Sequence, residues 1–276
     1  LIGEYLAGQV DSYFAVLTRA MLAGLLFLPL LRLRLLPRPV VPGLLVVGAL
    51  QFGVTYICLY QSFEYISVPE VLLFTIFTPL HVALIDDLLN RRFSLGPLVA
   101  AAIAVLGAGI MRYDGLSDSF IRGFLILQLA NFTFAAGQVG YAHLVRRYEL
   151  TSTQQWRGFG LFFIGALMVM LPAWLLLGNP ERLPHTALQW SVLAWLGLVA
   201  SGLGFLFWNR GAAQVDAGTL GIMNNALVPA GLLVNLLIWN HDADLLRLAA
   251  GSAVIGLSLW VNARWSRWFG ARPARP

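Results

Sequence analysis

The sequence of 276 residues has few charges, one cysteine and no lysine. Charged residues make up 11% of the chain and hydrophobic residues 59%, and the mean hydropathy is +0.76. A soluble globular chain averages about 25% charged and about 45–50% apolar residues. This composition excludes a water-soluble enzyme, a nucleic-acid-binding protein and a disulfide-rich secreted fold. The single cysteine, Cys58, has no intrachain partner for a disulfide or a cysteine-type metal site.

Nucleotide-binding motifs are also missing, since the sequence contains neither a P-loop nor a Rossmann fingerprint. ATP-driven transport would therefore need another chain, and the sequence indicates no such ATPase subunit. The four histidines lack the spacing of metal ligands, so we expect no metal and no other cofactor. The oligomeric state is not indicated.

Long apolar runs dominate the chain. About 20 apolar residues are needed to cross the roughly 30 Å hydrocarbon core of a bilayer. Nine segments qualify, at about 13–31, 43–63, 66–88, 95–112, 120–143, 156–178, 188–209, 218–239 and 245–263. Residues 1–8 read as the end of a further helix. The sequence therefore predicts an all-α, multi-pass protein of a bacterial inner membrane, with ten transmembrane helices of which the first is incomplete.

The arginines predict the orientation, because cytoplasmic loops are enriched in arginine. With the 31–43 loop inside and the spans alternating, thirteen arginines lie inside: Arg32, Arg34, Arg38, Arg91, Arg92, Arg146, Arg147, Arg157, Arg210, Arg264, Arg267, Arg272 and Arg275. Four lie outside: Arg112, Arg122, Arg182 and Arg247. This bias predicts a cytoplasmic C-terminal tail (265–276) and a periplasmic linker (113–119).

A weak internal repeat runs through the chain. At an offset of 150 residues, Pro79 falls on Pro229 and Thr75 falls on Asn225. At an offset of 149, Gly107 falls on Gly256. We therefore expect two five-helix repeats, at 1–112 and 120–264. An odd number of helices inverts the second copy, and inverted repeats are typical of secondary transporters.

The same features carry a resemblance to a known family. They are an arginine near the start of the second span (Arg19), a run from Ser67 to Pro79 followed by a glycine-rich helix, and a second run from Ala217 to Pro229 before Gly256. This pattern resembles the EamA-type members of the drug/metabolite transporter superfamily. The resemblance implies ten helices, cytoplasmic termini, a central cavity and export of amino acids or similar metabolites. Within that superfamily, the sequence is most similar to the exporters of amino acids, including aromatic ones. The incomplete first helix departs from the family pattern.

Two prolines near mid-span mark the predicted site and its hinges. Proline removes a backbone donor, so Pro79 frees the carbonyl of Thr75 and Pro229 frees that of Asn225. Polar backbone at this depth must face protein or a water-filled cavity. We expect a substrate site here; the alternative is a pair of structural kinks with locally satisfied carbonyls. Asn224 and Asn225 lie about 100° apart on their helix, so one can bind solute while the other bonds a neighbouring helix.

Other polar residues share helix faces with this site. Gln128, Asn131, Ala135 and Gln138 form one stripe, which faces either a pore or interhelical hydrogen-bond partners. Further residues are candidates because their helical spacing places them on the same helix faces as these polar residues. The full set of predicted substrate-binding residues is Gln51, Tyr56, Phe74, Thr75, Thr78, His81, Asn131, Gln138, Asn224 and Asn225.

Two charged residues have competing interpretations. Arg19 can hold a substrate carboxylate, or it can extend to the lipid headgroups. Glu70 can carry protons, but Ser67 and Glu70 fit a capping box at a helix start.

The sequence thus predicts a secondary transporter, not an enzyme. It would export small metabolites, above all amino acids including aromatic ones, by alternating access around a midplane cavity. Its partners would be the solute and membrane lipid, without nucleic acid. The alternatives are a passive solute channel and a transporter of an unrelated metabolite.

Overall fold

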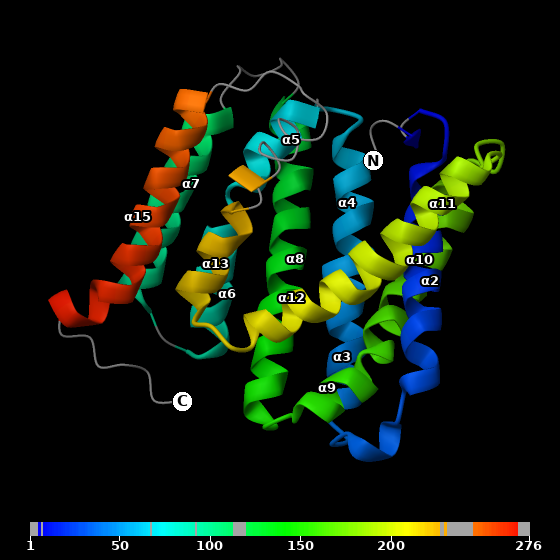
Figure 1. The fold of residues 1–276 in the computed structure, drawn as a ribbon, viewed down its shortest axis with the longest axis horizontal. Helices are drawn as coiled ribbons and strands as arrows, with labels where there is room; N and C mark the ends of the chain where they lie inside the picture. The colour runs from blue at the N-terminus through cyan, green and yellow to red at the C-terminus, as the bar shows by residue number, and fades with distance from the viewer. Residues whose placement is uncertain are drawn as a thin grey trace. The chain divides into compact units, whose positions relative to one another are not determined.

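The computed structural model describes residues 5–6, 8–66, 68–91, 93–112, 120–226, 229–230 and 245–269. Within these residues every regular element is a helix (Figure 1). Four helices are long and apolar enough to cross a membrane, namely Ser12–Leu30, Val40–Ser62, Ser152–Leu177 and Ala187–Ala212. The predicted all-α membrane fold is confirmed. The count of ten helices stays a prediction, and the predicted linker 113–119 and residues 270–276 of the tail lie outside the described residues.

The helices alternate with short breaks. In chain order they are α2 (Ser12–Phe27), α3 (Val40–Gly48), α4 (Thr55–Ser62), α5 (Val68–Thr75), α6 (Thr78–Leu89), α7 (Leu95–Arg112), α8 (Phe120–Arg147), α9 (Ser152–Gly158), α10 (Gly160–Leu177), α11 (Ala187–Trp195), α12 (Gly204–Ala212), α13 (Ala217–Asn225) and α15 (Leu245–Phe269). Two π-helical segments, η3 (Ala49–Val54) and η4 (Leu196–Leu203), join α3 to α4 and α11 to α12.

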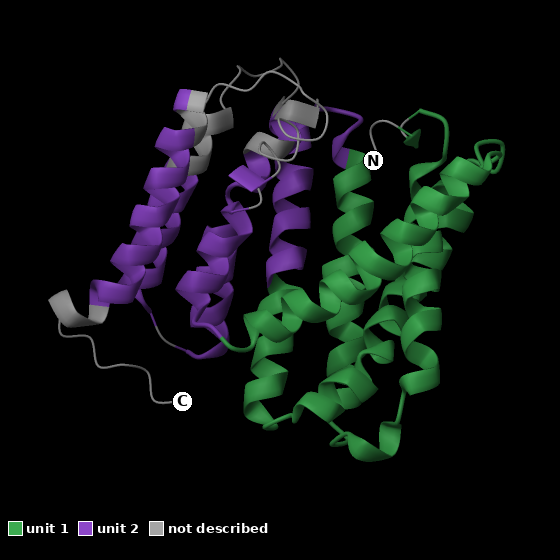
Figure 2. Ribbon diagram, viewed as in Figure 1, with its two compact units in different colours: residues 1–61, 136–214 green, residues 62–135, 215–276 purple. Residues whose placement is uncertain are grey.

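The chain forms two compact units (Figure 2). Unit 1 comprises Leu1–Gln61 and Ala136–Gln214, and unit 2 comprises Ser62–Ala135 and Val215–Pro276. Helix α8 contributes its first part to unit 2 and its second part to unit 1. Each unit draws helices from both sequence halves. The units record spatial contacts, whereas the predicted repeats concern order along the chain, so the repeats stay a prediction.

Unit 1 is packed around α10. This helix contacts α2, α3 and η3, and five fully buried phenylalanines fill the core: Phe27, Phe52, Phe159, Phe162 and Phe163. Glycine permits the closest approaches, since a Cβ on Gly48 would overlap the Phe162 carbonyl and one on Gly165 would overlap the Leu45 carbonyl. Small residues let membrane helices approach backbone to backbone. The glycines therefore set the spacing of α3 and α10.

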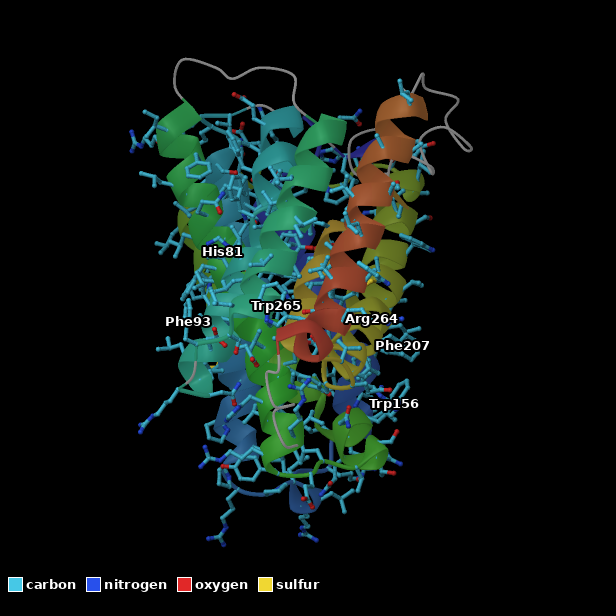
Figure 3. The ribbon with its side chains drawn as sticks, turned by 90° about the vertical axis from the view of Figure 1, so that its left-hand side faces the viewer. His81, Phe93, Trp156, Phe207, Arg264 and Trp265 are labelled. Carbon is cyan, nitrogen blue, oxygen red and sulfur yellow. The ribbon has the colours of Figure 1, made fainter. Side chains whose placement is uncertain are left out.

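In unit 2, α15 packs along α7, and α13 packs on α6 and α7 (Figure 1). Asp216 caps α13 by accepting the Thr219 amide at 3.0 Å, and it also accepts Asn262 Nδ2 of α15 at 2.8 Å. Burial raises the pKa of the Asp216 carboxyl, but the hydrogen bonds from Thr219 and Asn262 lower the pKa more, and leave it below its usual value. Trp265 lies near the C-terminal end of α15 (Figure 3). Its ring lies close to Gly96 of α7, where an added Cβ would overlap it.

Candidate functional site

The predicted hinge at Pro79 lies directly after a helix break in unit 2. Helix α5 ends at Thr75 and α6 begins at Thr78. The Thr78 hydroxyl donates to the Thr75 carbonyl at 2.7 Å, which is the carbonyl that Pro79 frees. The Thr75 hydroxyl donates to the Val71 carbonyl at 2.5 Å. Both threonines therefore satisfy backbone locally in this structure.

Side-chain amides satisfy the carbonyls on either side. Asn131 Nδ2 and Gln128 Nε2 of α8 donate to the Phe74 carbonyl at 2.9 and 3.1 Å. Asn225 Nδ2 of α13 donates to the Ile76 carbonyl at 3.0 Å. Backbone carbonyls inside a bilayer need such internal partners. Side chains of α8 and α13 thus bond the backbone of the break, as the alternative of interhelical hydrogen bonds predicts. The role of these amides in solute binding stays a prediction.

The remaining unit 2 candidates lie apart from these bonds. Asn224 donates to the Leu220 carbonyl of its own helix at 2.9 Å, whereas Asn225 donates to the Ile76 carbonyl across the break. His81 (Figure 3) is half-buried. Its Nδ1 lies 3.2 Å from the Phe77 carbonyl, and its ring lies beside Phe132.

Two further predictions of unit 2 fall partly outside the described residues. Ser67 of the expected capping box lies outside them, although Glu70 is buried. Residues 227–228, just before the second hinge Pro229, also lie outside. The capping box and the second hinge stay predictions.

Unit 1 contains a buried arginine. Arg19 is 5% exposed; its Nε donates to Ser201 Oγ and its Nη2 donates to the Tyr56 hydroxyl, both at 3.0 Å. The guanidinium carbon also lies 5.1 Å from the centre of the Tyr56 ring. Extension of Arg19 to the headgroups is therefore wrong, because packing against η4 and α4 keeps it inside the unit. Sequence reasoning missed Ser201, whose only signal is its place 150 residues after Gln51.

Gln51 is the second unusual polar residue of unit 1. Its side chain is 0% exposed, and neither amide atom has a hydrogen-bond partner within the described residues. It precedes Phe52, whose ring contacts Tyr56 at 4.8 Å and Phe205 at 5.2 Å. Leaving a buried polar group unpaired costs about 1–3 kcal/mol, so such a group calls for an explanation. Gln138, by contrast, accepts Trp208 Nε1 at 2.9 Å.

Gln51 and Ser201 both lie on π-helical segments, and such segments occur frequently at functional sites. Unit 1 therefore combines a buried cation, an unpaired amide and aromatic rings. These groups suit an organic solute that has a carboxylate, an apolar body and amide-like polar atoms. Within the described residues no three His, Cys, Asp or Glu side chains are grouped to hold a metal ion.

The fold and these features define a helical membrane protein that handles a small organic solute. The family model for the EamA-like transporter family matches residues 1–113. A relative from Pseudomonas aeruginosa named "Probable biotin transporter" is 66% identical over 95% of this chain and 91% of its own length. The "Biotin transporter" of Escherichia coli K12 is 51% identical over 95% of this chain and 87% of its own, and that of Salmonella typhimurium is 51% identical over 96% and 88%.

Among the solved structures that match, one crystal structure has a TM-score of 0.76 at 18% identity and covers 94% of this chain and 90% of that one. That likeness shows the fold alone. The sequence relatives show more: this chain belongs to the EamA-like transporter family and is a membrane-embedded transporter of a small-molecule solute. The relatives are named as transporters, which agrees with the expectation that the chain is not an enzyme.

Proposed function

We propose that this chain is a secondary carrier of biotin that works by alternating access. The observation that carries the proposal is the identity of 66% and 51%, over nearly the whole chain, with relatives named as biotin transporters. Amino acids, including aromatic ones, are the second candidate class of solute, and the family resemblance supports them.

The chemistry of unit 1 supports biotin. Biotin has a carboxylate on an apolar chain, a thioether ring and a ureido group that both donates and accepts hydrogen bonds. Arg19 matches the carboxylate, the rings of Tyr56 and Phe52 match the apolar body, and Gln51 has the complementary donors and acceptors of a primary amide.

The second candidate has one specific observation in its favour. Tyr13, Tyr56 and Tyr60 form a chain of ring contacts at 5.8 and 6.1 Å beside Arg19, which would suit an aromatic side chain. An amino acid also brings an ammonium group, and this group needs an anionic or carbonyl partner. No carboxylate of the described residues pairs with Arg19, so a simple carboxylate fits this neighbourhood better than a zwitterion.

The proposed location is the inner membrane with a cytoplasmic C-terminus. Several arginines assigned to the inside lie together at one end of unit 1: the Arg32 amide donates to the Arg157 carbonyl at 3.1 Å, and Arg210 donates to Ser152 at 2.7 Å. Such clustering supports one cytoplasmic end. A reporter fused to the C-terminus, active only in the cytoplasm, tests the orientation.

Counterflow in liposomes tests the transported solute. Purified protein is reconstituted, the vesicles are loaded with unlabelled solute, and uptake of labelled biotin, Phe, Trp, Thr or Met is measured against protein-free vesicles. We expect saturable, trans-stimulated uptake of biotin alone. Counterflow of an amino acid without biotin would support the second candidate, and flux without saturation or trans-stimulation would indicate a channel.

A further inference from the structure

Arg19 is a cation held away from water without an anion. It is 5% exposed on α2, and no carboxylate within the described residues pairs with it. An isolated buried charge is costly enough that proteins almost always pair it. The hydrogen bonds to Ser201 and Tyr56 come from neutral acceptors, which orient the guanidinium but leave its charge uncompensated. A bound anion would therefore compensate the positive charge of Arg19.

The geometry leaves part of the guanidinium available. Ser201 uses Nε and Tyr56 uses Nη2, whereas Nη1 has no hydrogen-bond partner in the part of the chain that the structure describes. Guanidinium groups bind carboxylates through parallel N–H donors, and such charged hydrogen bonds are about twice as strong as neutral ones. Because the two neutral acceptors come from η4 and α4, they fix the plane of the group from two sides. A fixed plane lowers the entropy lost when an anion binds.

The aromatic surroundings fix the position further. The Tyr56 ring lies 5.1 Å from the guanidinium carbon, Tyr60 lies 6.1 Å from Tyr56, and Tyr13 holds Tyr60 from α2 at 5.8 Å. Gln61 Nε2 donates to the Tyr13 hydroxyl at 2.6 Å. These contacts hold Tyr56 in place, and Tyr56 in turn holds Arg19. The arrangement therefore holds the guanidinium in one orientation within unit 1.

We propose that Arg19 binds the carboxylate of the transported solute, with Ser201 and Tyr56 as positioning residues. This inference rests on the proposed function in one respect only, which is that biotin supplies the carboxylate. The chemical class of ligand is a monocarboxylate with an apolar chain. A carrier built this way distinguishes biotin from its uncharged methyl ester, and that discrimination depends on the charge of residue 19.

Competition against labelled biotin counterflow tests this. In the wild type, the methyl ester should compete at least about tenfold more weakly than biotin, which corresponds to about 1.4 kcal/mol. Arg19→Gln should weaken biotin and leave the ester unchanged, so that their ratio falls to about one. Arg19→Lys should keep part of the preference for biotin over its ester, because the charge remains but the parallel N–H donors of the guanidinium are lost. Arg32→Gln, at an exposed loop arginine, is the matched control and should keep the full ratio.

The outcomes are separable. Equal competition by acid and ester in the wild type overturns the inference, and so does an Arg19→Gln variant that weakens both equally, which is the result of a purely structural arginine. Size-exclusion profiles and melting temperatures show whether each variant is folded. Tyr56→Phe removes one acceptor without altering the charge, and we expect it to weaken biotin while the acid still outcompetes the ester.

If the wild type does not carry biotin, the proposed function fails and Arg19 is tested with simpler probes. Pentanoate should raise the melting temperature of the wild type more than pentanamide does, and the difference should vanish in Arg19→Gln. The same effect of both probes on the wild type overturns the carboxylate site, whatever the transported solute is.

Discussion

The two compact units differ in how the backbone hydrogen bonds of their helices are satisfied. Among the described residues, the four helices that are long and apolar enough to span a membrane lie in unit 1, apart from the terminal Ser62. Unit 1 keeps its backbone bonding continuous through η3 and η4 and fills its interior with aromatic rings. In unit 2, α5 stops before α6, and side-chain amides replace the missing backbone donors.

This difference separates two kinds of polar residue. In unit 2, Gln128, Asn131 and Asn225 donate to carbonyls of the break, so their removal leaves backbone carbonyls without these partners. In unit 1, Arg19 and Gln51 keep hydrogen-bonding capacity that the described residues do not use. The comparison therefore favours unit 1 for the groups that recognise the solute and unit 2 for bonds that support a bent helix. Each prediction below tests one side of it.

The largest effect is expected where unit 1 depends on close backbone packing. Gly48→Ala places a Cβ against the Phe162 carbonyl, and backbone cannot give way as a flexible side chain can. We expect a loss of about 3 kcal/mol or more, measured as a lower melting temperature in detergent. Gly211→Ala is the matched control, because no atom lies within 4 Å of its added Cβ. Equal stability of the two variants would contradict the packing described for α3 and α10.

The next effect concerns the amides of unit 2. Asn131→Leu removes the shorter of two hydrogen bonds to the Phe74 carbonyl, and hydrogen bonds in membrane proteins contribute about 0.6–2 kcal/mol. We expect a lower melting temperature together with reduced transport. Asn90→Leu serves as control, because within the described residues its exposed side chain donates only to the Asp86 carbonyl one turn earlier, at 2.8 Å, and we expect it to cost less. If Asn131→Leu instead melts like the wild type and only weakens solute binding, Asn131 is a binding residue as the sequence predicts.

A smaller effect is expected at the hinge itself. Pro79→Ala restores a backbone donor that can compete with Thr78 for the Thr75 carbonyl and straighten the helix. Stability should change by less than about 1 kcal/mol, whereas the counterflow rate should fall by up to about tenfold if the bend takes part in transport. Pro172→Ala, at the proline within α10 of unit 1, is the control. Equal counterflow rates for Pro79→Ala and Pro172→Ala would contradict a role of Pro79 as a hinge in transport.

The smallest effect is electrostatic. Since the folded pKa of Asp216 lies below its usual value of 3.8, its ionised form stabilises the protein above about that pH, and this stabilisation is lost as the pH falls through the folded pKa. Asp216→Asn keeps a capping side chain but removes the charge, so it should lower the free energy of unfolding at pH 7 by less than about 1 kcal/mol, measured as a slightly lower melting temperature. The gap between wild type and variant should close toward pH 3. A gap that stays constant with pH would show that ionisation contributes nothing.

Much of the fold could be predicted because it depends on local pattern. Apolar runs of bilayer length predicted the four spanning helices that are found among the described residues. Pro79 predicted the break after α5, because a missing backbone donor acts within its own helix. The stripe of Gln128 and Asn131 was correctly read as one face of α8, since both reach the same Phe74 carbonyl. Which of the neighbouring amides Asn224 and Asn225 reaches the Ile76 carbonyl could not be predicted, because either one is compatible with the helical periodicity.

The sequence by itself determined the membrane as the environment in which this protein folds, its helical class and the helix break before Pro79, since each follows from hydrophobicity and backbone chemistry within one segment. Only the tertiary structure decided which polar groups meet. Arg19 and Ser201 are 182 residues apart and bond because η4 packs on α2. No local pattern specifies that pair, because the partner of a buried charge is chosen by the packing of distant helices.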